Sequence, residues 1–263
     1  ALDMINQYGD KFLRKQRENK RALEELKQAL DLNKLPIRIE AYDISNISGV
    51  NSVGSMVVFE KGEPKRSDYR RFKIQSVSTP DDYKSMEEII RRRFIRGLKE
   101  RTAIEENKIK IKGFSIFPDL IMLDGGKGQV NIGTGVLKEL DLDIPICGLV
   151  KDDFHKTRGV IYNNEEINLD ESSIGFRLIY RIQEEAHRFA ISYHRSLRSK
   201  DMFKSQLDGI RGIGDKRKKE LLKHFHTIDN IKKASVEDLI KVEGMNRRVA
   251  EDLYNHFRDD EGE

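Results

Sequence analysis

The spacing of apolar residues changes several times along this chain of 263 residues. Over residues 1–33, apolar positions recur at helical intervals among Lys, Glu and Gln, so this segment predicts a helical connecting arm of one or two charged helices. Its thin apolar stripe consists of Leu2, Ile5, Phe12, Leu23, Leu26 and Leu30. Between 36 and 75 the pattern alternates, and three stretches predict neighbouring strands of an antiparallel meander: IRIEAYDI, SVGSMVVFE and YRRFKI.

The middle of the chain alternates helical and strand patterns. STPDDYKSMEEIIRRRFIRGLKER predicts a helix to about residue 101, with Thr79 as its cap, Pro80 in its first position and Asp82 in its first turn. The continuous apolar runs PDLIMLD and IPICGLVKD predict buried parallel strands on either side of the helix KGQVNIGTGVLKEL. A hairpin around 158–169 and a long helix over 173–199 follow. The order β-β-β-α-β-α-β predicts an α/β domain over 34–199, a mixed sheet flanked by helices in the order of the ribonuclease H-like fold.

An internal repeat dominates the C-terminal part. LDGIRGIGDKRKKELLKHF (207–225) matches LIKVEGMNRRVAEDLYNHF (239–257), and each copy predicts a helix, a tight glycine turn and a second helix. The apolar pairs of the two turns, Ile210 with Ile213 and Val242 with Met245, should face one shared core. We therefore expect a linker over 200–206, a small all-α tandem helix-hairpin-helix domain over 207–258 and an acidic tail over 259–263.

Composition limits the possible partners and compartments. The chain carries 49 basic and 45 acidic residues, so an anionic partner must be recognised by local basic clusters and not by the net charge of +4. The single cysteine, Cys147, lies in an apolar run and predicts a buried thiol, which suits a cytoplasmic protein without disulfides. No apolar run is long enough to span a membrane and no signal peptide opens the chain. The opening ALDMINQYGDKF is typical of the interior of a longer protein.

The stretch IMLDGGKGQVN at 121–131 does not have the G-x-x-x-x-G-K-[ST] spacing of a nucleotide-phosphate loop. Its aspartate, Asp124, follows a buried strand at the carboxyl end, where the sites of open α/β sheets gather. A carboxylate there is costly unless a cation or hydrogen bonds satisfy it. The glycines that follow would let a phosphate backbone approach closely, and Lys127 would add a positive charge.

A second carboxylate, Asp43, interrupts the first strand, which should lie near the centre of the sheet. Alone, Asp43 could be a turn cap, but two carboxylates on neighbouring strands predict an oxygen-ligand site for Mg²⁺ or Mn²⁺. His187 lies beside the apolar stripe of the long helix. It could be structural, a metal ligand or a proton-transfer group. Asp82 is explained equally well as a first-turn carboxylate of its helix and by chemistry.

Basic residues and glycine turns suggest contacts with a phosphodiester backbone and no reading of bases. The candidate DNA-binding residues are Lys127, Arg91, Arg92, Arg188, His194, Arg195, Gly212, Gly214, Lys216, Arg217 and Lys218.

Taken in order, several stretches closely resemble the C-terminal half of the UvrC family, the nuclease subunit of bacterial nucleotide excision repair. These are YDISNISG, SDYRRFKI, PDDYKSMEEIIRRRF, PDLIMLDGGKGQ, IQEEAHRFAISYHR and GIRGIGDKRKKELLKHF, and the resemblance covers essentially the whole chain. The resemblance implies a ribonuclease H-like endonuclease domain with a tandem helix-hairpin-helix domain behind it, acting on damaged double-stranded DNA. It implies the incision on the 5′ side of a lesion, with the 3′ cut and the module that binds UvrB belonging to upstream segments of the family.

The resemblance also assigns roles. It implies a catalytic triad of Asp43, Asp124 and His187, with Asp82 as a further acidic residue. The second hairpin, with Asn246 in place of the last glycine of Gly-x-Gly, departs from the pattern of the first. Two alternatives to this function are an endonuclease V-like or resolvase-like free-standing nuclease, and a non-catalytic DNA-binding platform whose acidic residues are structural.

Overall fold

The computed structural model describes residues 2–47, 51–76, 81–108, 113–151 and 157–259, with side chains over 9–45, 53–76, 81–108, 113–151, 157–192 and 206–258. The chain divides into two compact units, residues 1–191 and 192–263, and each is described by itself. Every helix in the described part of the chain is too short or too polar to cross a lipid bilayer.

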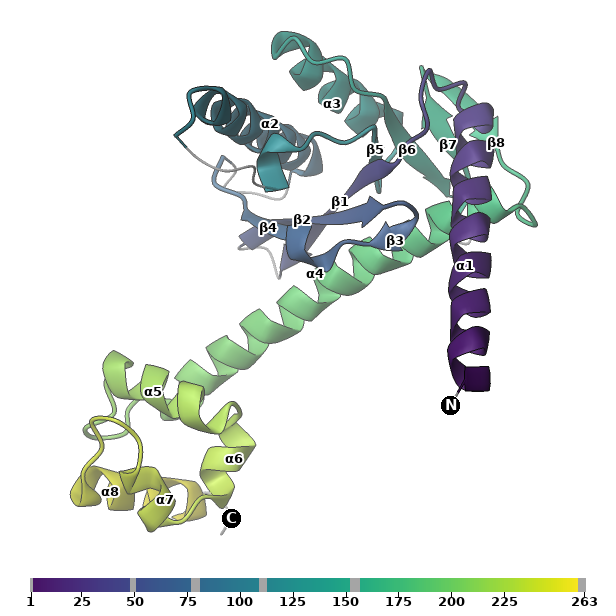
Figure 1. The fold of residues 1–263 in the computed structure, drawn as a ribbon. Coiled ribbons are helices and arrows are strands. Elements are labelled where there is room, and N and C mark those ends of the chain that lie inside the picture. Colours follow the sequence, from purple (N-terminus) through teal and green to yellow (C-terminus); the bar gives the residue numbers. More distant parts are fainter. Residues whose placement is uncertain (1, 48–50, 77–80, 109–112, 152–156, 260–263) are drawn as a thin grey trace. The chain divides into compact units, whose positions relative to one another are not determined.

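The first unit is built on one mixed sheet (Figure 1). Its strands run in the order β3-β2-β1-β5-β6-β7-β8, with β4 paired to β2. β1 pairs antiparallel with β2 and parallel with β5, which in turn is parallel to β6. The strands are β1 Arg38–Ile47, β2 Asn51–Glu60, β3 Glu63–Pro64, β4 Arg70–Lys73, β5 Leu120–Leu123, β6 Ile146–Lys151, β7 Thr157–Tyr162 and β8 Glu165–Asn168. The meander, the buried parallel pair and the late hairpin agree with the sequence prediction.

Helices cover both faces of this sheet. Figure 1 shows α2 (Asp82–Glu105) and α3 (Lys127–Glu139) on one side and α4 (Ile174–Leu207) crossing the other. The stripe of α4 is buried at Ile179, Ile182 and Ala186, as predicted. The cap of α2 differs from the prediction: Asp81 caps the helix by accepting a hydrogen bond from the backbone N–H of Lys84, while residues 79 and 80 lie outside the described residues.

Residues 1–33 do more than connect. They form one helix, α1 (Leu2–Ala29), and its C-terminal half is buried in the core of the first unit at Ala22, Leu23 and Leu26. Its Glu25 accepts a hydrogen bond from the backbone N–H of Gly175 at the start of α4. Phe12, earlier on the same stripe, is 61% exposed, so this position of the stripe does not pack against the sheet.

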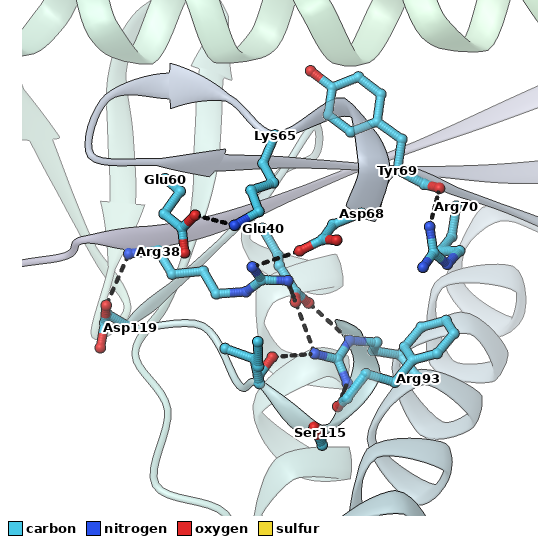
Figure 2. Close-up of polar contacts among 12 residues, drawn as sticks. Arg38, Glu40, Glu60, Lys65, Asp68, Tyr69, Arg70, Arg93, Ser115 and Asp119 are labelled. Atoms are coloured by element: carbon cyan, nitrogen blue, oxygen red, sulfur yellow. Dashed lines mark hydrogen bonds and ion pairs between the residues drawn. The ribbon is translucent and has the colours of Figure 1, made fainter. Parts of the chain in front are cut away.

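A buried network of charges joins β1 to α2 (Figure 2). Arg93 of α2 and Glu40 of β1 are both fully buried, and the guanidinium donates to the carboxylate through Nε at 3.1 Å and Nη2 at 2.8 Å. Arg93 also donates to the backbone oxygens of Phe114 and Ile116, which anchors the segment before β5. The run RRRF therefore does not lie wholly on a solvated surface: its third arginine is part of the core.

The second unit is all-helical. It contains α5 (Asp215–Phe225), α6 (Ile228–Lys233), α7 (Val236–Ile240) and α8 (Arg247–Asp259). One core takes residues from both copies of the repeat, including Ile210, Ile213 and Val242, with Met245 packed against it. This confirms the predicted shared core. The predicted linker at 200–206 is wrong as local structure, because α4 continues as a helix through it to Leu207.

Candidate active site

The pairing of β1 with β5 places two aspartates next to each other. Tyr42 is the register partner of Leu123, and the backbone N–H of Asp124 donates to the carbonyl oxygen of Tyr42 at 2.9 Å. Asp43 and Asp124 are the next residues on the two strands. Since β1 and β5 are parallel, both carboxylates lie at the same carboxyl-end edge of the sheet, near its centre.

Asp43 is held in an environment that disfavours its charge. Asp43 is 6% exposed, and its Oδ2 atom is buried without a hydrogen-bond partner. Burial, followed by the neighbouring Asp124 carboxylate, raises the pKa of Asp43 to about 6. Asp82 adds to this rise, while His187 and Lys151 oppose it. The structure thus brings Asp124, Asp82 and His187 each within electrostatic range of Asp43.

Asp124 is held by a cation of the chain itself. Lys151, the last residue of β6, places its Nζ atom 2.7 Å from Asp124 Oδ1. The side chain of Gln183 on α4 donates to the same oxygen at 3.5 Å and accepts a hydrogen bond from the hydroxyl of Thr157. In the sequence, Lys151 is one of many basic residues, and its partner could not be predicted because it comes from a different strand.

His187 and Asp82 approach the pair from the helices. His187 lies on α4 with an exposed side chain, one residue after the buried Ala186 of the core stripe. Asp82 is the first residue of α2 and is exposed, in the first-turn position that the sequence predicts. The N-cap is Asp81, so Asp82 is the first-turn carboxylate of α2, and both readings of it stay open.

A divalent cation suits part of this arrangement. In the described part of the chain, no three or more His, Cys, Asp and Glu side chains lie close enough together to hold a metal ion. The buried, unpartnered Oδ2 of Asp43 and the neighbouring Asp124, which already binds an ammonium, nevertheless form an oxygen-donor pair in need of positive charge. These two carboxylates fit a hard divalent cation such as Mg²⁺ or Mn²⁺.

A glycine on the neighbouring strand β6 lets that strand come close to the end of β5. A Cβ on Gly148 of β6 would meet the backbone oxygen of Gly125 at 2.3 Å. β6 can therefore approach the end of β5 this closely only because residue 148 is a glycine. Gly126 is the N-cap of α3 without a side-chain cap, and the exposed Lys127 opens the helix. This free helix N-terminus lies directly after Asp124 and favours an anion.

Several predicted DNA-binding residues of the first unit bond within the unit. Arg91 pairs with Glu87 and Glu139, Arg92 with Glu88 and the carbonyl of Lys73, and Arg188 with Glu185. His194 and Arg195 belong to α4, and their side chains lie outside the described residues. Arg91, Arg92 and Arg188 thus each have an acidic partner within the unit, and their contacts with DNA stay a prediction.

The first hairpin has the features of a phosphate-binding turn. Gly212 has φ +83°, in the left-handed region that favours glycine, and α5 begins after Gly214 without a side-chain cap. Lys216 is exposed. Lys218, in contrast, has a side chain only 12% exposed and forms an ion pair with Asp208.

The second hairpin keeps this geometry although Asn246 replaces a glycine. Gly244 has φ +81°, and the backbone N–H of Met245 donates to Val242 as Ile213 does to Ile210 in the first copy. Asn246 replaces Gly214, whose φ of −90° and ψ of 178° any residue can adopt. Its Oδ1 atom accepts a hydrogen bond from Val249 and so caps α8.

These features define a ribonuclease H-like domain with paired carboxylates at its central strand ends, joined to a tandem helix-hairpin-helix domain. Residues 27–191 match the family described as the UvrC RNAse H endonuclease domain, and residues 207–263 match the helix-hairpin-helix motif. The chain belongs to the UvrC family.

Two curated relatives illustrate the match. The UvrABC system protein C of Clostridium perfringens strain SM101 is 56% identical over 98% of this chain. The protein of the same description from Lachnospira eligens is 55% identical over 97% of it. The chain spans 42% and 41% of the length of these two relatives.

Proposed function

We propose that this chain is the part of a nucleotide excision repair nuclease that makes the incision on the 5′ side of a lesion in double-stranded DNA. The reaction is hydrolysis of a phosphodiester and depends on Mg²⁺ or Mn²⁺. The first unit cuts, and the second unit holds the duplex by its backbone. UvrB is the expected protein partner, through a module that family members carry upstream of this region.

One observation carries the proposal. Asp43, within β1, and Asp124, directly after β5, lie side by side, with Asp43 buried and one of its oxygens unpartnered. A purely structural aspartate in such a position would be expected to have its hydrogen bonds satisfied. The rise in the pKa of Asp43 supports the same conclusion, since perturbed carboxyl groups concentrate at functional sites.

Each residue then has a task. Asp43 and Asp124 would hold the divalent ion, which would neutralise charge on the phosphodiester and promote attack by water. His187, exposed on α4 and within electrostatic range of Asp43, would orient the attacking water and accept its proton. Lys151 would release Asp124 as the ion is taken up. Asp82 would add a further negative group at the same edge.

The test is incision of a nicked duplex carrying a lesion, in Mn²⁺, with DNA binding measured in parallel on the same preparations. Asp43→Ala, Asp124→Ala and His187→Ala should each lose incision, while binding survives through the second unit. Asp143→Asn is the matched control, because this exposed aspartate precedes β6 at the opposite edge of the sheet and should cut normally.

Incision by Asp43→Ala at the rate of the unchanged chain would refute the assignment of the site. If the unchanged chain binds DNA but does not cut it with any metal ion, a non-catalytic DNA-binding platform is the better description of this chain.

A further inference from the structure

One guanidinium connects the two hairpins of the second unit. Arg217, in the first turn of α5, donates through Nε to the carbonyl oxygen of Gly244 at 2.7 Å. It donates through Nη1 to the carbonyl oxygen of Gly212 at 2.5 Å. These two glycines hold the left-handed positions at which the two hairpins turn. The planar fork of arginine suits such a double contact, which the single ammonium of lysine cannot reproduce in the same geometry.

The repeat makes this contact one half of a reciprocal arrangement. The residue that corresponds to Arg217 in the second copy is Val249 of α8. A Cβ built on Gly212 would meet Cγ2 of Val249 at 2.8 Å, so Val249 packs directly on the first hairpin. Each copy therefore sends the side chain from the same position of its second helix to the glycine of the other copy. The contact made by Val249 is apolar, and the contact made by Arg217 is one hydrogen bond to the other copy, with a second to the glycine of its own copy.

The remaining cations of the two hairpins are distributed differently. Lys216 and its counterpart Arg248 are both exposed, and neither makes an ion pair with a described residue. These two side chains are available to phosphates, whereas Arg217 is only partly exposed and bonded at two of its nitrogens.

We propose that Arg217 is a positioning residue that fixes the two hairpins at one separation, so that both engage the same duplex together. Lys216, Arg248 and the hairpin backbones would then make the contacts to phosphate. The inference rests on the proposed DNA binding of the second unit. Two contacts that are held in register bind far more tightly than either alone, because the second is effectively intramolecular.

Two replacements at position 217 separate positioning from phosphate contact. Arg217→Lys keeps the charge and loses the fork. Arg217→citrulline, introduced by protein semisynthesis, keeps the Nε–H and one terminal NH₂ and loses the charge. Binding of the whole chain to a fluorescein-labelled duplex is followed by anisotropy in EDTA over a series of KCl concentrations. Lys216→Gln and Lys216→Arg serve as the matched pair for a residue that contacts phosphate through charge.

If Arg217 positions the hairpins, Arg217→Lys weakens binding roughly tenfold, within the range that linked contacts provide. The citrulline variant stays within about twofold of the unchanged chain and keeps its salt slope. Lys216→Gln lowers the salt slope by about 0.9, the value for one phosphate contact, and Lys216→Arg restores it.

The opposite pattern overturns the proposal: normal binding by Arg217→Lys, with weak binding and a slope lower by about 0.9 for the citrulline variant. If Arg217→Lys unfolds the second unit, seen by the loss of the Gly212 and Gly244 amide resonances, the citrulline variant alone decides. If the unchanged chain shows no salt-dependent binding to the duplex, the proposed DNA binding by the second unit is refuted, and the proposed role of Arg217 is refuted with it.

Discussion

Replacing Asp43 by asparagine should stabilise the metal-free protein at neutral pH. Asparagine has nearly the same shape as a protonated aspartate and carries no charge. The pKa of Asp43 rises from its ordinary 3.8 to about 6 in the folded protein, chiefly because the carboxyl is buried. A rise of about two pKa units corresponds to a cost of about 3 kcal/mol for keeping the charged carboxylate folded.

The sign follows from which form the folded state prefers. The folded protein binds the proton of Asp43 more tightly than the unfolded chain does, so this group favours folding most below pH 3.8. That contribution is lost as the pH rises through about 6. Asp43→Asn should therefore differ little from the unchanged chain near pH 4. It should be more stable by about 1.5 kcal/mol at pH 5 and by about 3 kcal/mol at pH 8.

The assay is urea unfolding followed by far-UV circular dichroism in EDTA at pH 4, 5, 6, 7 and 8. Asp143→Asn is the control for loss of an exposed carboxylate and should show no such trend. Saturating Mg²⁺ should stabilise the unchanged chain and not the Asp43→Asn variant, because only the former keeps the carboxylate. A difference that does not vary with pH, or a variant less stable than the unchanged chain at pH 8, would refute the assignment of a costly buried charge at this position.

Three further substitutions test other parts of the first unit. Arg93→Met leaves Glu40 buried without its partner and should lower the free energy of unfolding in urea by about 3–5 kcal/mol; a loss below about 1 kcal/mol would contradict the buried pair. Gly148→Ala places a Cβ against the backbone oxygen of the residue after Asp124, so incision should fall about hundredfold while DNA binding is unchanged. Lys151→Met removes a competing cation from Asp124 and should tighten Mn²⁺ binding about twofold to fivefold by isothermal titration; unchanged or weaker binding would show that the lysine does not compete with the metal.

The sequence was sufficient to predict the sheet and the paired aspartates. Alternating and continuous apolar runs identified the meander and the parallel strands, and an aspartate at the end of each of two such strands is unusual enough to stand out. The neighbourhood of Asp43 and Asp124 follows from the parallel pairing of β1 with β5. The roles of these residues remain proposals.

Tertiary partners account for what the sequence could not predict. Arg38 and Glu40 occupy polar positions of an alternating strand, a pattern that normally indicates a solvated face, yet both are buried. Arg93 lies in the run RRRF of a helix, and such a run of charged residues also normally indicates a solvated face. Charges can be buried here because each finds its partner on another element, and such pairs are not encoded in local periodicity. The packing of α1 against the sheet was not predicted, because the exposed residues 9–18 dilute the apolar pattern of the buried end of the helix.

The hairpins illustrate a different limit. A Gly-to-Asn difference at position 246 departs from the pattern of the first hairpin, but the replaced glycine has an extended backbone that asparagine also adopts. Gly212 and Gly244, which do need glycine, are present in both copies. Sequence alone does not reveal which glycine of a Gly-x-Gly motif is required by its backbone angle.

The fully buried pair of Glu40 and Arg93 constrains how this chain can vary over time. A lineage that altered either side chain alone would pass through a poorly folded intermediate, so the two codons should be retained together or exchanged together. In a collection of related genes, positions 40 and 93 would then change together, and few of the genes would differ at one of these positions alone.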